Sequence, residues 1–267
     1  MPEGDTVWYT ARRLDEALAN RTLTRTDFRV PRLATSTLAG QLVTEVVPRG
    51  KHLLARTSDG LTVHTHLRMD GSWRVTPAAQ RVPDNHRIRL ILANGEWQAT
   101  GYQLGVVELL RTSAEDQVTG HLGPDLLGPD WDADEAVRRL TEDKDRPIGE
   151  ALLDQRNLAG IGNVYKSEVL FMRRVSPWTP AGDVHQLDAL VEQARTLLDA
   201  NKDRVRRTTT RSTRPGEESW VYGRRGRGCR RCGTAIRARG QQDRITYWCP
   251  RCQPGEPDQP QPPARTR

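Results

Sequence analysis

The sequence lacks long apolar runs and has few cysteines and few aromatic residues. No stretch of 18 apolar residues occurs among its 267, which excludes a membrane-spanning helix of ordinary length. The first residues include acids and lack the apolar segment of a secretory signal, so we expect a cytoplasmic protein. The chain is long enough for two domains, or for one domain with a small appendage.

Basic residues are concentrated toward the C-terminus. The formal net charge is +7, and the segment Lys202–Cys252 contains 15 Lys/Arg against 4 Asp/Glu. A basic segment on a mildly acidic remainder is typical of proteins that bind a polyanion, with nucleic acid the first candidate. A solvated basic tail is the plainer alternative, but all the cysteines and several aromatic residues lie in the same stretch.

The order of hydrophobic patterns predicts a β-rich first half and a helical second half. Val7, Leu14 and Leu18 recur at helical spacing and predict an amphipathic helix over Thr6–Ala19. From about residue 22 to residue 110, short β-rich runs alternate with turn signals, which predicts a sandwich or a barrel without deciding between them. Further helices are predicted at 133–140, 148–153, 164–172 and 187–198. The polar segment 201–219 is predicted to form a mobile loop.

The four cysteines form two Cys-x-x-Cys pairs separated by sixteen residues. They are Cys229, Cys232, Cys249 and Cys252. Two such pairs can supply four thiolates in a tetrahedron, which is the ligand set of a structural zinc ribbon. Two disulfides are the alternative, and a cytosolic compartment disfavours them. Because no cysteine is left over, we predict one structural Zn²⁺ ion with no open coordination position.

The start of the chain offers an unusual nucleophile. Removal of Met1 would expose the secondary amine of Pro2. An α-amino group has a pKa of about 8 and a lysine of about 10.4, so the terminus carries up to roughly 300-fold more free base at neutral pH. Condensed with a sugar aldehyde, a secondary amine gives an iminium cation, an electron sink that promotes loss of a 3′ phosphate. Glu3 beside it could donate and accept protons.

Six motifs, in order along the chain up to Cys252, resemble the formamidopyrimidine-DNA glycosylase/endonuclease VIII (Fpg/Nei) family. They are MPEGDT at 1–6, RGKHLL at 49–54, HLRMDG at 66–71, HLGPDLL at 121–127, LAGIGNVYKSEVLF at 158–171 and CRRCGTAIRARGQQDRITYWCPRC at 229–252. The ordered set is far more specific than any one motif. The resemblance implies a base-excision-repair DNA glycosylase and abasic-site lyase, which removes oxidised bases through a Schiff base and β,δ-elimination.

The fold that this resemblance implies is α+β and multidomain. A catalytic β-sandwich with a flanking helix would occupy residues 1–115, and a linker residues 116–132. A helix-two-turn-helix DNA-binding domain would follow at 133–219, then a zinc-ribbon β-hairpin at 220–253 and a disordered tail at 254–267. Damaged double-stranded DNA, or single-stranded or bubble DNA, would bind between the domains of a monomeric, nucleoid-associated protein.

The resemblance also implies catalytic roles for four residues. Pro2 would be the nucleophile that displaces the base at C1′, and Glu3 would protonate the opening sugar. Lys51 would contact the phosphate of the lesion and assist proton transfer. Arg244 would grip phosphates from the zinc hairpin and act in the second, δ-elimination.

Three further residues are implied DNA contacts. Asn163 would bind the DNA backbone from the helix-two-turn-helix turn. Arg68 and Met69 belong to the 66–71 motif, in which Met69 would fill the gap left by the flipped-out base. Taken alone, Met69 is more often a core residue. The histidines, His64 and His66 on one strand included, are expected to make polar contacts or support the fold rather than bind metal.

Departures from the family pattern favour the endonuclease VIII branch. The lysine that the purine-specific branch carries before its helix-two-turn-helix is replaced by Gly149 or Glu150, and the wedge loop of that branch by Thr100–Gly105. The opening PEG rather than PEL points the same way. Oxidised pyrimidines are therefore expected as substrates in preference to 8-oxoguanine. Asp5 stands where the family usually has Glu, which weakens that contact or moves it to water.

Three alternatives stay open. The first is excision of purines of the 8-oxoguanine or formamidopyrimidine type. The second is a non-catalytic module that binds DNA lesions, which the presence of Pro2, Glu3 and Lys51 disfavours. The third is an enzyme of the same family that acts mainly on abasic sites or single strands.

Overall fold

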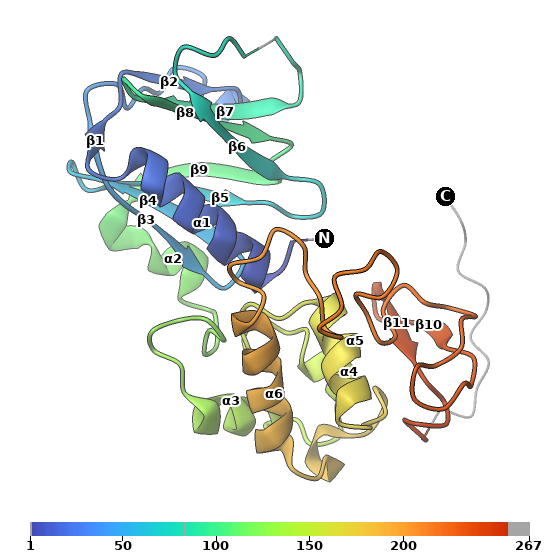
Figure 1. The fold of residues 1–267 in the computed structure, drawn as a ribbon. Helices are drawn as coiled ribbons and strands as arrows, with labels where there is room; N and C mark the ends of the chain where they lie inside the picture. Colours follow the sequence, from blue (N-terminus) through green and yellow to red (C-terminus); the bar gives the residue numbers. More distant parts are fainter. Residues whose placement is uncertain (1, 83, 256–267) are drawn as a thin grey trace. The chain divides into compact units, whose positions relative to one another are not determined.

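The computed structural model describes residues 2–82 and 84–255 and divides into two compact units between His121 and Leu122 (Figure 1). The division falls inside the segment 116–132 that was predicted to be a linker. Part of that segment is regular, because the short helix α2 spans Asp116–Thr119. Met1 and residues 256–267 of the predicted disordered tail lie outside the described residues.

The first unit begins with helix α1 (Gly4–Leu18), which starts two residues before the predicted Thr6. Val7, Leu14 and Leu18 are buried, as the spacing predicted. The helix packs on strand β3, where the carboxylate of Asp15 accepts a hydrogen bond of 2.7 Å from the amide of Val46. The apolar side of α1 thus joins the core of the first unit.

Two antiparallel sheets make up the rest of the first unit. Their strand orders are β1-β3-β4-β5-β9 and β2-β7-β8-β6. The strands are β1 (Arg21–Thr22), β2 (Arg25–Phe28), β3 (Leu42–Arg49), β4 (His52–Thr57), β5 (Leu61–His66), β6 (Ser72–Pro77), β7 (Ile88–Ala93), β8 (Trp97–Tyr102) and β9 (Val106–Arg111). Figure 1 shows them as two layers, and apolar side chains of both sheets share one core. The unit is therefore a β-sandwich.

The first sheet has one apolar face and one polar face. Leu53 and Val63 belong to the core, so the residues that alternate with them along β4 and β5 point the other way. These include three histidines, His52, His64 and His66. The short helices η1 (Pro31–Leu33) and η2 (Thr112–Ala114) complete the first unit.

The second unit is helical and ends in a hairpin. Its helices are α3 (Ala133–Leu140), α4 (Ile148–Ala151), α5 (Asn163–Met172), η3 (Ala181–Asp183) and α6 (Leu187–Asp199). Strands β10 (Arg237–Gln241) and β11 (Arg244–Trp248) pair antiparallel, as expected for a zinc-ribbon hairpin. The α+β fold with a sandwich, a helical domain and a zinc hairpin is thus confirmed.

The segment 201–219 lies outside the helices and strands, as predicted, but its ends are tied down. The side chain of Asn201 donates to the carbonyl of Thr208 (2.9 Å) and accepts from the amide of Thr208 (2.8 Å). The amide of Thr209 donates to the carbonyl of Glu218. The polar residues of this segment, from which a mobile loop was predicted, form the hydrogen bonds that hold its ends in place.

Candidate active site and nucleic-acid interface

Pro2 and Glu3 lie directly before the first turn of α1. Glu3 occupies the N-cap position in an extended conformation, and its side chain makes no capping bond. Its carboxyl group is completely buried, whereas Pro2 is half-buried. The positive end of the helix dipole faces this pair. The predicted nucleophile Pro2 and a buried carboxyl group therefore adjoin each other in the chain.

Lys51 lies in the turn that joins β3 to β4. Arg49 and His52 pair across the hairpin, and Gly50 adopts the left-handed conformation (φ 57°) that a two-residue turn requires. Lys51 is half-buried, and its charge helps to lower the pKa of His66 on the neighbouring strand. The turn therefore presents a lysine next to the polar face of the first sheet.

Arg68 and Met69 form a turn between β5 and β6. Arg68 has a left-handed backbone (φ 54°), and its amide donates to Nδ1 of His66 at 2.9 Å. Met69 is 50% exposed, so it is not a core residue. An exposed methionine on a tight turn has the shape that a wedge needs.

Four of the six histidines come together on the first unit. The ring of His52 stacks on His64 and meets His66 and His121 edge-on. His52 Nδ1 and His64 Nε2 are 2.8 Å apart, and His64 Nδ1 lies 2.9 Å from the carboxylate of Glu108. Burial, together with the other histidines and Arg68, lowers the pKa of His52 to about 3. The cluster makes polar contacts, as the sequence predicted for His64 and His66.

Asn163 and Lys166 join helix α5 to the hairpin of the second unit. The side-chain amide of Asn163 donates to the carbonyl of Ile245 at 2.8 Å. Lys166 is completely buried and donates to the hydroxyl of Thr246 at 2.6 Å. The predicted DNA contact Asn163 therefore also fixes the hairpin against α5.

Arg244 lies at the tip of the β10–β11 hairpin. It is the first residue of β11, and the turn before it contains Gln242 in a left-handed conformation (φ 51°). The side chain of Gln242 donates to the carboxylate of Glu150 on α4 at 2.7 Å. The guanidinium of Arg244 is 3.7 Å from Asp243 and remains 38% exposed. The hairpin thus holds a basic group at an anchored tip.

Gly149 has no room for a side chain. A Cβ at this position would lie 2.6 Å from Oε1 of Gln241 and 2.8 Å from the carbonyl of Pro177. The neighbouring Glu150 is engaged by Gln242. A lysine therefore does not fit at Gly149 in this arrangement.

The four cysteines have the geometry of a tetrahedral metal site. Their sulfur atoms all lie within 4.8 Å of one another. The Sγ–Sγ distances are 4.0 Å for Cys229–Cys252, 3.5 Å for Cys232–Cys249 and 3.6 Å for Cys232–Cys252. Four sulfurs at 2.3 Å from a zinc ion would be about 3.8 Å apart, whereas a disulfide requires about 2.05 Å. The donor set fits one structural Zn²⁺ ion and does not fit the disulfide alternative.

The thiols of this site differ in acidity. Hydrogen bonds from Thr234 lower the pKa of Cys232 to about 6, while burial and neighbouring thiols raise the pKa of Cys252 to about 12. Zinc coordination would override this difference, because a coordinated thiol is held as a thiolate.

Arginines of the first cysteine pair connect the zinc site to its surroundings. Arg231 donates to the carbonyls of Phe171 and Met172 at the end of α5, and its guanidinium lies over the ring of Phe171. Arg230 donates to the carbonyls of Gly216 and Ser219. A cation at a helix C-terminus is favourable, so Arg231 stabilises the end of helix α5. Arg230 holds two carbonyls of the segment 209–222.

Glu168 anchors the same segment from helix α5. This buried carboxylate accepts hydrogen bonds from the amides of Trp220 (2.7 Å), Val221 (2.8 Å) and Tyr222 (2.8 Å) and from the hydroxyl of Thr209. The motif that contains Glu168 was noted in the sequence, but the role of its carboxylate was not predicted.

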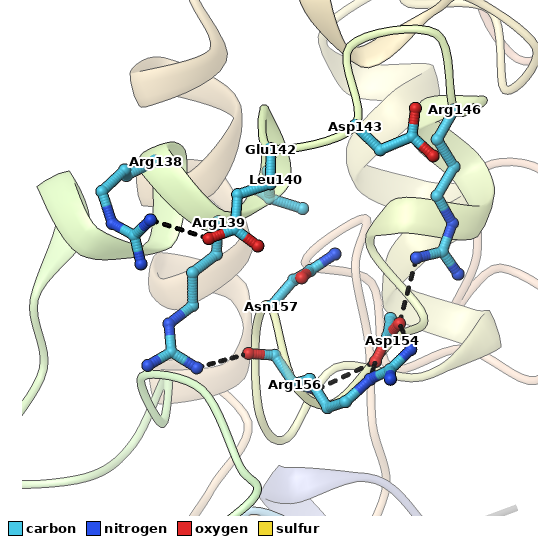
Figure 2. Close-up of a pocket in the computed structure, with 9 residues that line it drawn as sticks. All are labelled: Arg138, Arg139, Leu140, Glu142, Asp143, Arg146, Asp154, Arg156 and Asn157. Atoms are coloured by element: carbon cyan, nitrogen blue, oxygen red, sulfur yellow. Dashed lines mark hydrogen bonds and ion pairs between the residues drawn. The ribbon is translucent and has the colours of Figure 1, made fainter.

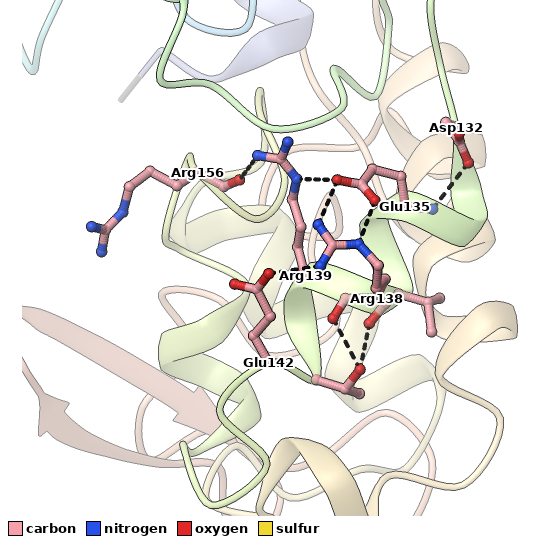
Figure 3. Close-up of polar contacts among 8 residues, drawn as sticks. Asp132, Glu135, Arg138, Arg139, Glu142 and Arg156 are labelled. Carbon is pink, nitrogen blue, oxygen red and sulfur yellow. Dashed lines mark hydrogen bonds and ion pairs between the residues drawn. The ribbon is translucent and has the colours of Figure 1, made fainter.

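A separate cavity of about 420 Å³ is lined by the end of helix α3 and by the loops on either side of helix α4 (Figure 2). Its arginines are engaged in the fold. Arg146 and Arg156 both bond to Asp154, and the pKa of that carboxyl is held well below its usual range. Figure 3 shows the other two arginines, Arg138 and Arg139, which share the carboxylate of Glu135. Because these four arginines are paired with carboxylates of the same unit, we interpret their role as structural.

The predicted residues fall into two groups. Pro2, Glu3, Lys51, Arg68 and Met69 belong to the first unit. Asn163, Arg244 and the zinc cysteines belong to the second. The histidine cluster and Glu108 were missed, although the alternation His64-Thr65-His66 on a strand was a signal that both rings share one face.

Sequence models of three protein families match the chain. Residues 1–101 match the formamidopyrimidine-DNA glycosylase N-terminal domain, and residues 122–212 match the H2TH domain of the same enzymes. Residues 229–255 match the zinc finger found in FPG and IleRS. A β-sandwich, a helical domain and a zinc hairpin in this order define the DNA glycosylases of this type, and the chain belongs to the Fpg/Nei family.

Within the family, the relatives that are 48–55% identical to this chain are named endonuclease 8 2 or Nei2. It is 55% identical to the probable endonuclease 8 2 of Streptomyces coelicolor, over 97% of this chain and 96% of the relative. It is 48% identical to the DNA-(apurinic or apyrimidinic site) lyase Nei2 of Mycolicibacterium smegmatis, over 95% and 99%. The formamidopyrimidine-DNA glycosylase of Rhizorhabdus wittichii is 34% identical, over 95% and 100%. The predicted branch is thus confirmed.

Solved structures confirm the fold. The Lactococcus lactis formamidopyrimidine-DNA glycosylase, non-covalently bound to DNA with an AP site, matches with a TM-score of 0.81 and 24% identity, over 95% of this chain and all of that one. Across the described residues, no helix is long and apolar enough to cross a membrane.

Proposed function

We propose that this chain is a base-excision-repair DNA glycosylase and abasic-site lyase that acts on oxidised pyrimidines. The observation that carries the proposal is the pair at the start of α1, where a completely buried Glu3 follows Pro2. The chain that carries this pair is itself 48–55% identical to proteins named endonuclease 8 2 or AP lyase.

The first chemical step is attack of the Pro2 amine on C1′ of the damaged nucleotide. The C1′–N bond to the base breaks, and the base leaves with a proton. Glu3 protonates the ring oxygen, which opens the sugar and leaves an iminium between Pro2 and C1′. Because the nitrogen of this iminium carries no proton, it stays cationic.

Two eliminations follow from that cation. A base removes a proton from C2′, and the electron pair forms a C1′=C2′ double bond while the iminium nitrogen takes up a lone pair, which gives an enamine. That lone pair then re-forms the iminium, a C2′=C3′ double bond forms, and the C3′–O bond breaks, so that the 3′ phosphate leaves. In the second elimination a base removes the C4′ proton, a C4′=C5′ double bond forms in conjugation with the first, and the C5′–O bond breaks, so that the 5′ phosphate leaves. Lys51 neutralises phosphate charge at the lesion and assists proton transfer, and Arg244 acts on the phosphates of the second elimination. Both would stabilise charge that develops on leaving phosphates.

DNA binding rests on the basic groups of both units. Arg68 and Met69 would enter the helix at the lesion, with Met69 filling the space of the extruded base. Asn163 and Arg244 would contact the DNA backbone, held in position by α5 and the zinc hairpin. Zinc supplies no reacting group; its four thiolates stabilise the hairpin that presents Arg244.

The preference for pyrimidines is supported by two features of the structure. Gly149 has no space for the lysine of the purine-specific branch. Residues Thr100–Tyr102 end strand β8, so only Gln103–Gly105 connect it to β9, and Leu104 is buried. This short turn supports the absence of the longer wedge loop. Excision of purines is the second candidate, favoured by the 34% identity to a formamidopyrimidine-DNA glycosylase.

The proposal extends to organisation and location. We place the catalytic sandwich at 1–115, the helix-two-turn-helix domain at 133–219 and the zinc finger at 220–253, in a monomer that works in the cytoplasm on nucleoid DNA. Duplex DNA is the proposed form of the substrate, and comparison with single-stranded and bubble DNA tests that choice.

Borohydride trapping tests the proposed activity. Wild type is incubated with oligonucleotides that contain an abasic site, thymine glycol or 8-oxoguanine, and the covalent adducts are quantified. We expect adducts with the abasic site and thymine glycol, and fewer with 8-oxoguanine. Binding without any adduct would instead support a non-catalytic lesion-binding module, and a preference for 8-oxoguanine would overturn the pyrimidine assignment.

A further inference from the structure

The turn Leu67–Gly71 is held in one backbone conformation. Its second residue, Arg68, is left-handed, and its amide donates to His66 Nδ1 at 2.9 Å. The turn closes with a bond of 2.9 Å from the amide of Gly71 to the carbonyl of Leu67. A Cβ on Gly71 would lie 2.3 Å from that carbonyl oxygen, so the closure requires glycine.

Gly105, the residue directly before strand β9, supports the same turn. Its amide donates to the carbonyl of His66 at 3.0 Å. A Cβ on Gly105 would lie 2.1 Å from Cγ of Arg68, so the aliphatic stem of Arg68 rests directly on the glycine backbone. The direction in which Arg68 leaves the sheet therefore depends on the missing side chain at residue 105.

His66 can accept the Arg68 amide only when Nδ1 carries a lone pair. The ring must then be uncharged, with its proton on Nε2. Burial, together with the charges of Arg68 and Lys51 and with His64, lowers the pKa of His66 to about 4. The uncharged form that the geometry requires is therefore the form present at neutral pH.

A column of side chains packs behind His66. The ring of His52 meets His66 edge-on at 5.0 Å between centroids, and His52 Nδ1 lies 2.8 Å from His64 Nε2. Because the Glu108 carboxylate accepts from His64 Nδ1, neutral His64 must accept on Nε2, and His52 must donate from Nδ1. One carboxylate thus sets the tautomers of two rings in sequence.

We propose that His66 and Gly105 are positioning residues that hold Arg68 and Met69 in one preformed conformation for lesion DNA, and that the Glu108–His64–His52 column fixes the ring of His66. The inference rests on the proposed function for the identity of the ligand, damaged DNA. Met69 is already 50% exposed in the free protein, so the cost of ordering the turn is met before binding.

Two substitutions of His66 separate the hydrogen bond from the bulk of the ring. His66→Asn keeps an acceptor near the place of Nδ1, whereas His66→Gln moves its acceptor one bond further away. We measure the ratio of affinities for a duplex with an abasic-site analogue and for the undamaged duplex. His66→Asn should keep the ratio within about twofold, and His66→Gln should lower it roughly threefold to tenfold, the effect of one lost hydrogen bond.

Loss of folding would weaken binding to both duplexes alike, so the ratio of the two affinities reports on the positioning role alone. An unchanged ratio in His66→Gln would overturn the proposal, and so would an equal loss in His66→Asn. Gly105→Ala tests the second support, since its methyl group must displace Arg68. Its effect should not add to that of Met69→Ala, because both act through the same turn. Full additivity of the two substitutions would contradict the proposal.

Histidine ¹⁵N NMR of the DNA-free protein tests the column directly. We expect His66 as the Nε2–H tautomer and His52 and His64 as Nδ1–H tautomers at neutral pH. Glu108→Gln should alter the His64 and His52 signals, whereas substitution of the exposed His185 should not. A His66 ring protonated on Nδ1 would overturn the proposal. Because this measurement involves no DNA, its failure is distinguishable from a failure of borohydride trapping.

Discussion

At the scale of single residues, the residues proposed to react with DNA lie at positions that the local backbone determines. Pro2 and Glu3 precede α1 directly, and Lys51 follows the left-handed Gly50 of a two-residue turn. These positions are determined locally, by a helix start and by a turn. That is why sequence motifs alone were enough to nominate them.

The contacts of the histidines were less predictable. Their polar contacts were expected from the sequence, but the hydrogen bond between His64 and Glu108 joins residues 44 positions apart. Such a pair depends on the register of β5 against β9, which no local pattern encodes.

The lowered pKa values of His52 and His66 predict a pH dependence of stability. Folding holds both rings uncharged, with pKa values of about 3 and 4 against about 6.5 in the unfolded chain. The unfolded state therefore binds more protons between these values, so the free energy of unfolding should fall as pH drops from about 6.5 toward 4.

Urea denaturation between pH 6.5 and 5.5 checks this expectation by comparing slopes. His52→Gln should reduce the loss of stability by up to about 1 kcal/mol relative to wild type over this interval. The matched control is substitution of the exposed His185, which should leave the slope unchanged. Equal slopes in wild type and His52→Gln would contradict the shifted pKa.

At the scale of elements, helix α5 organises the second unit through polar residues that it buries. Asn163, Lys166 and Glu168 are each 5% exposed or less, and each bonds to the hairpin or to the 209–222 segment. Helical periodicity predicted the helix over 164–172 correctly. It could not predict that polar residues would face inward, because their partners lie 41 to 82 residues further along the chain.

Glu168→Gln should loosen the 209–222 segment. A glutamine offers one acceptor oxygen where the carboxylate offers two, so at least one buried donor among Trp220, Val221 and Tyr222 loses its partner. We expect a loss of about 1–3 kcal/mol in the free energy of unfolding and faster hydrogen exchange at these amides. Glu192→Gln, at an exposed position of α6, is the control. Unchanged exchange at all three amides would show that the carboxylate does not hold the segment.

Removal of zinc should release the hairpin and its two neighbours together. Structural zinc sites of this kind contribute about 10–16 kcal/mol of apparent binding free energy, more than the short β10–β11 hairpin can replace. Chelation should therefore increase hydrogen exchange over 229–252, and also at the end of α5 and over 216–219, where Arg231 and Arg230 bind. Added Zn²⁺ should reverse the change. A metal-free protein with the exchange pattern and DNA affinity of the zinc form would refute the structural role.

At the scale of the whole molecule, ordered motifs predicted more than composition or periodicity did. Periodicity left a sandwich or a barrel open, because polar residues such as Gln98 and Thr100 of β8 are buried by the sandwich itself and weaken the alternation of polar and apolar side chains. The zinc site was predictable from spacing because its ligands lie in two short pairs. The support of the Arg68–Met69 turn was not, because it uses His66 at the end of β5 and Gly105 from the turn between β8 and β9, which are distant in the sequence.

The charge of the chain predicts a strong dependence of DNA binding on salt. Each phosphate contact releases counterions, so the logarithm of the association constant should fall linearly with the logarithm of salt concentration, by about 0.9 per contact. Arg244→Gln should make this slope shallower by about one, whereas Arg32→Gln, at an exposed site on η1, should not. Filter binding or fluorescence anisotropy at about 50 to 300 mM salt, over which the Debye length falls from about 14 Å to about 6 Å, provides the data. A flat salt dependence would contradict binding through phosphates.

The central claim is that the amine of Pro2 forms the covalent bond to DNA. It is tested most directly by mass spectrometry of the tryptic peptides from a borohydride-trapped complex with abasic-site DNA. The account predicts that the DNA remnant is attached to the N-terminal nitrogen of the peptide Pro2–Arg12, with Met1 removed. Attachment to Lys51 or to any other lysine, with an unmodified Pro2–Arg12 peptide, would contradict it.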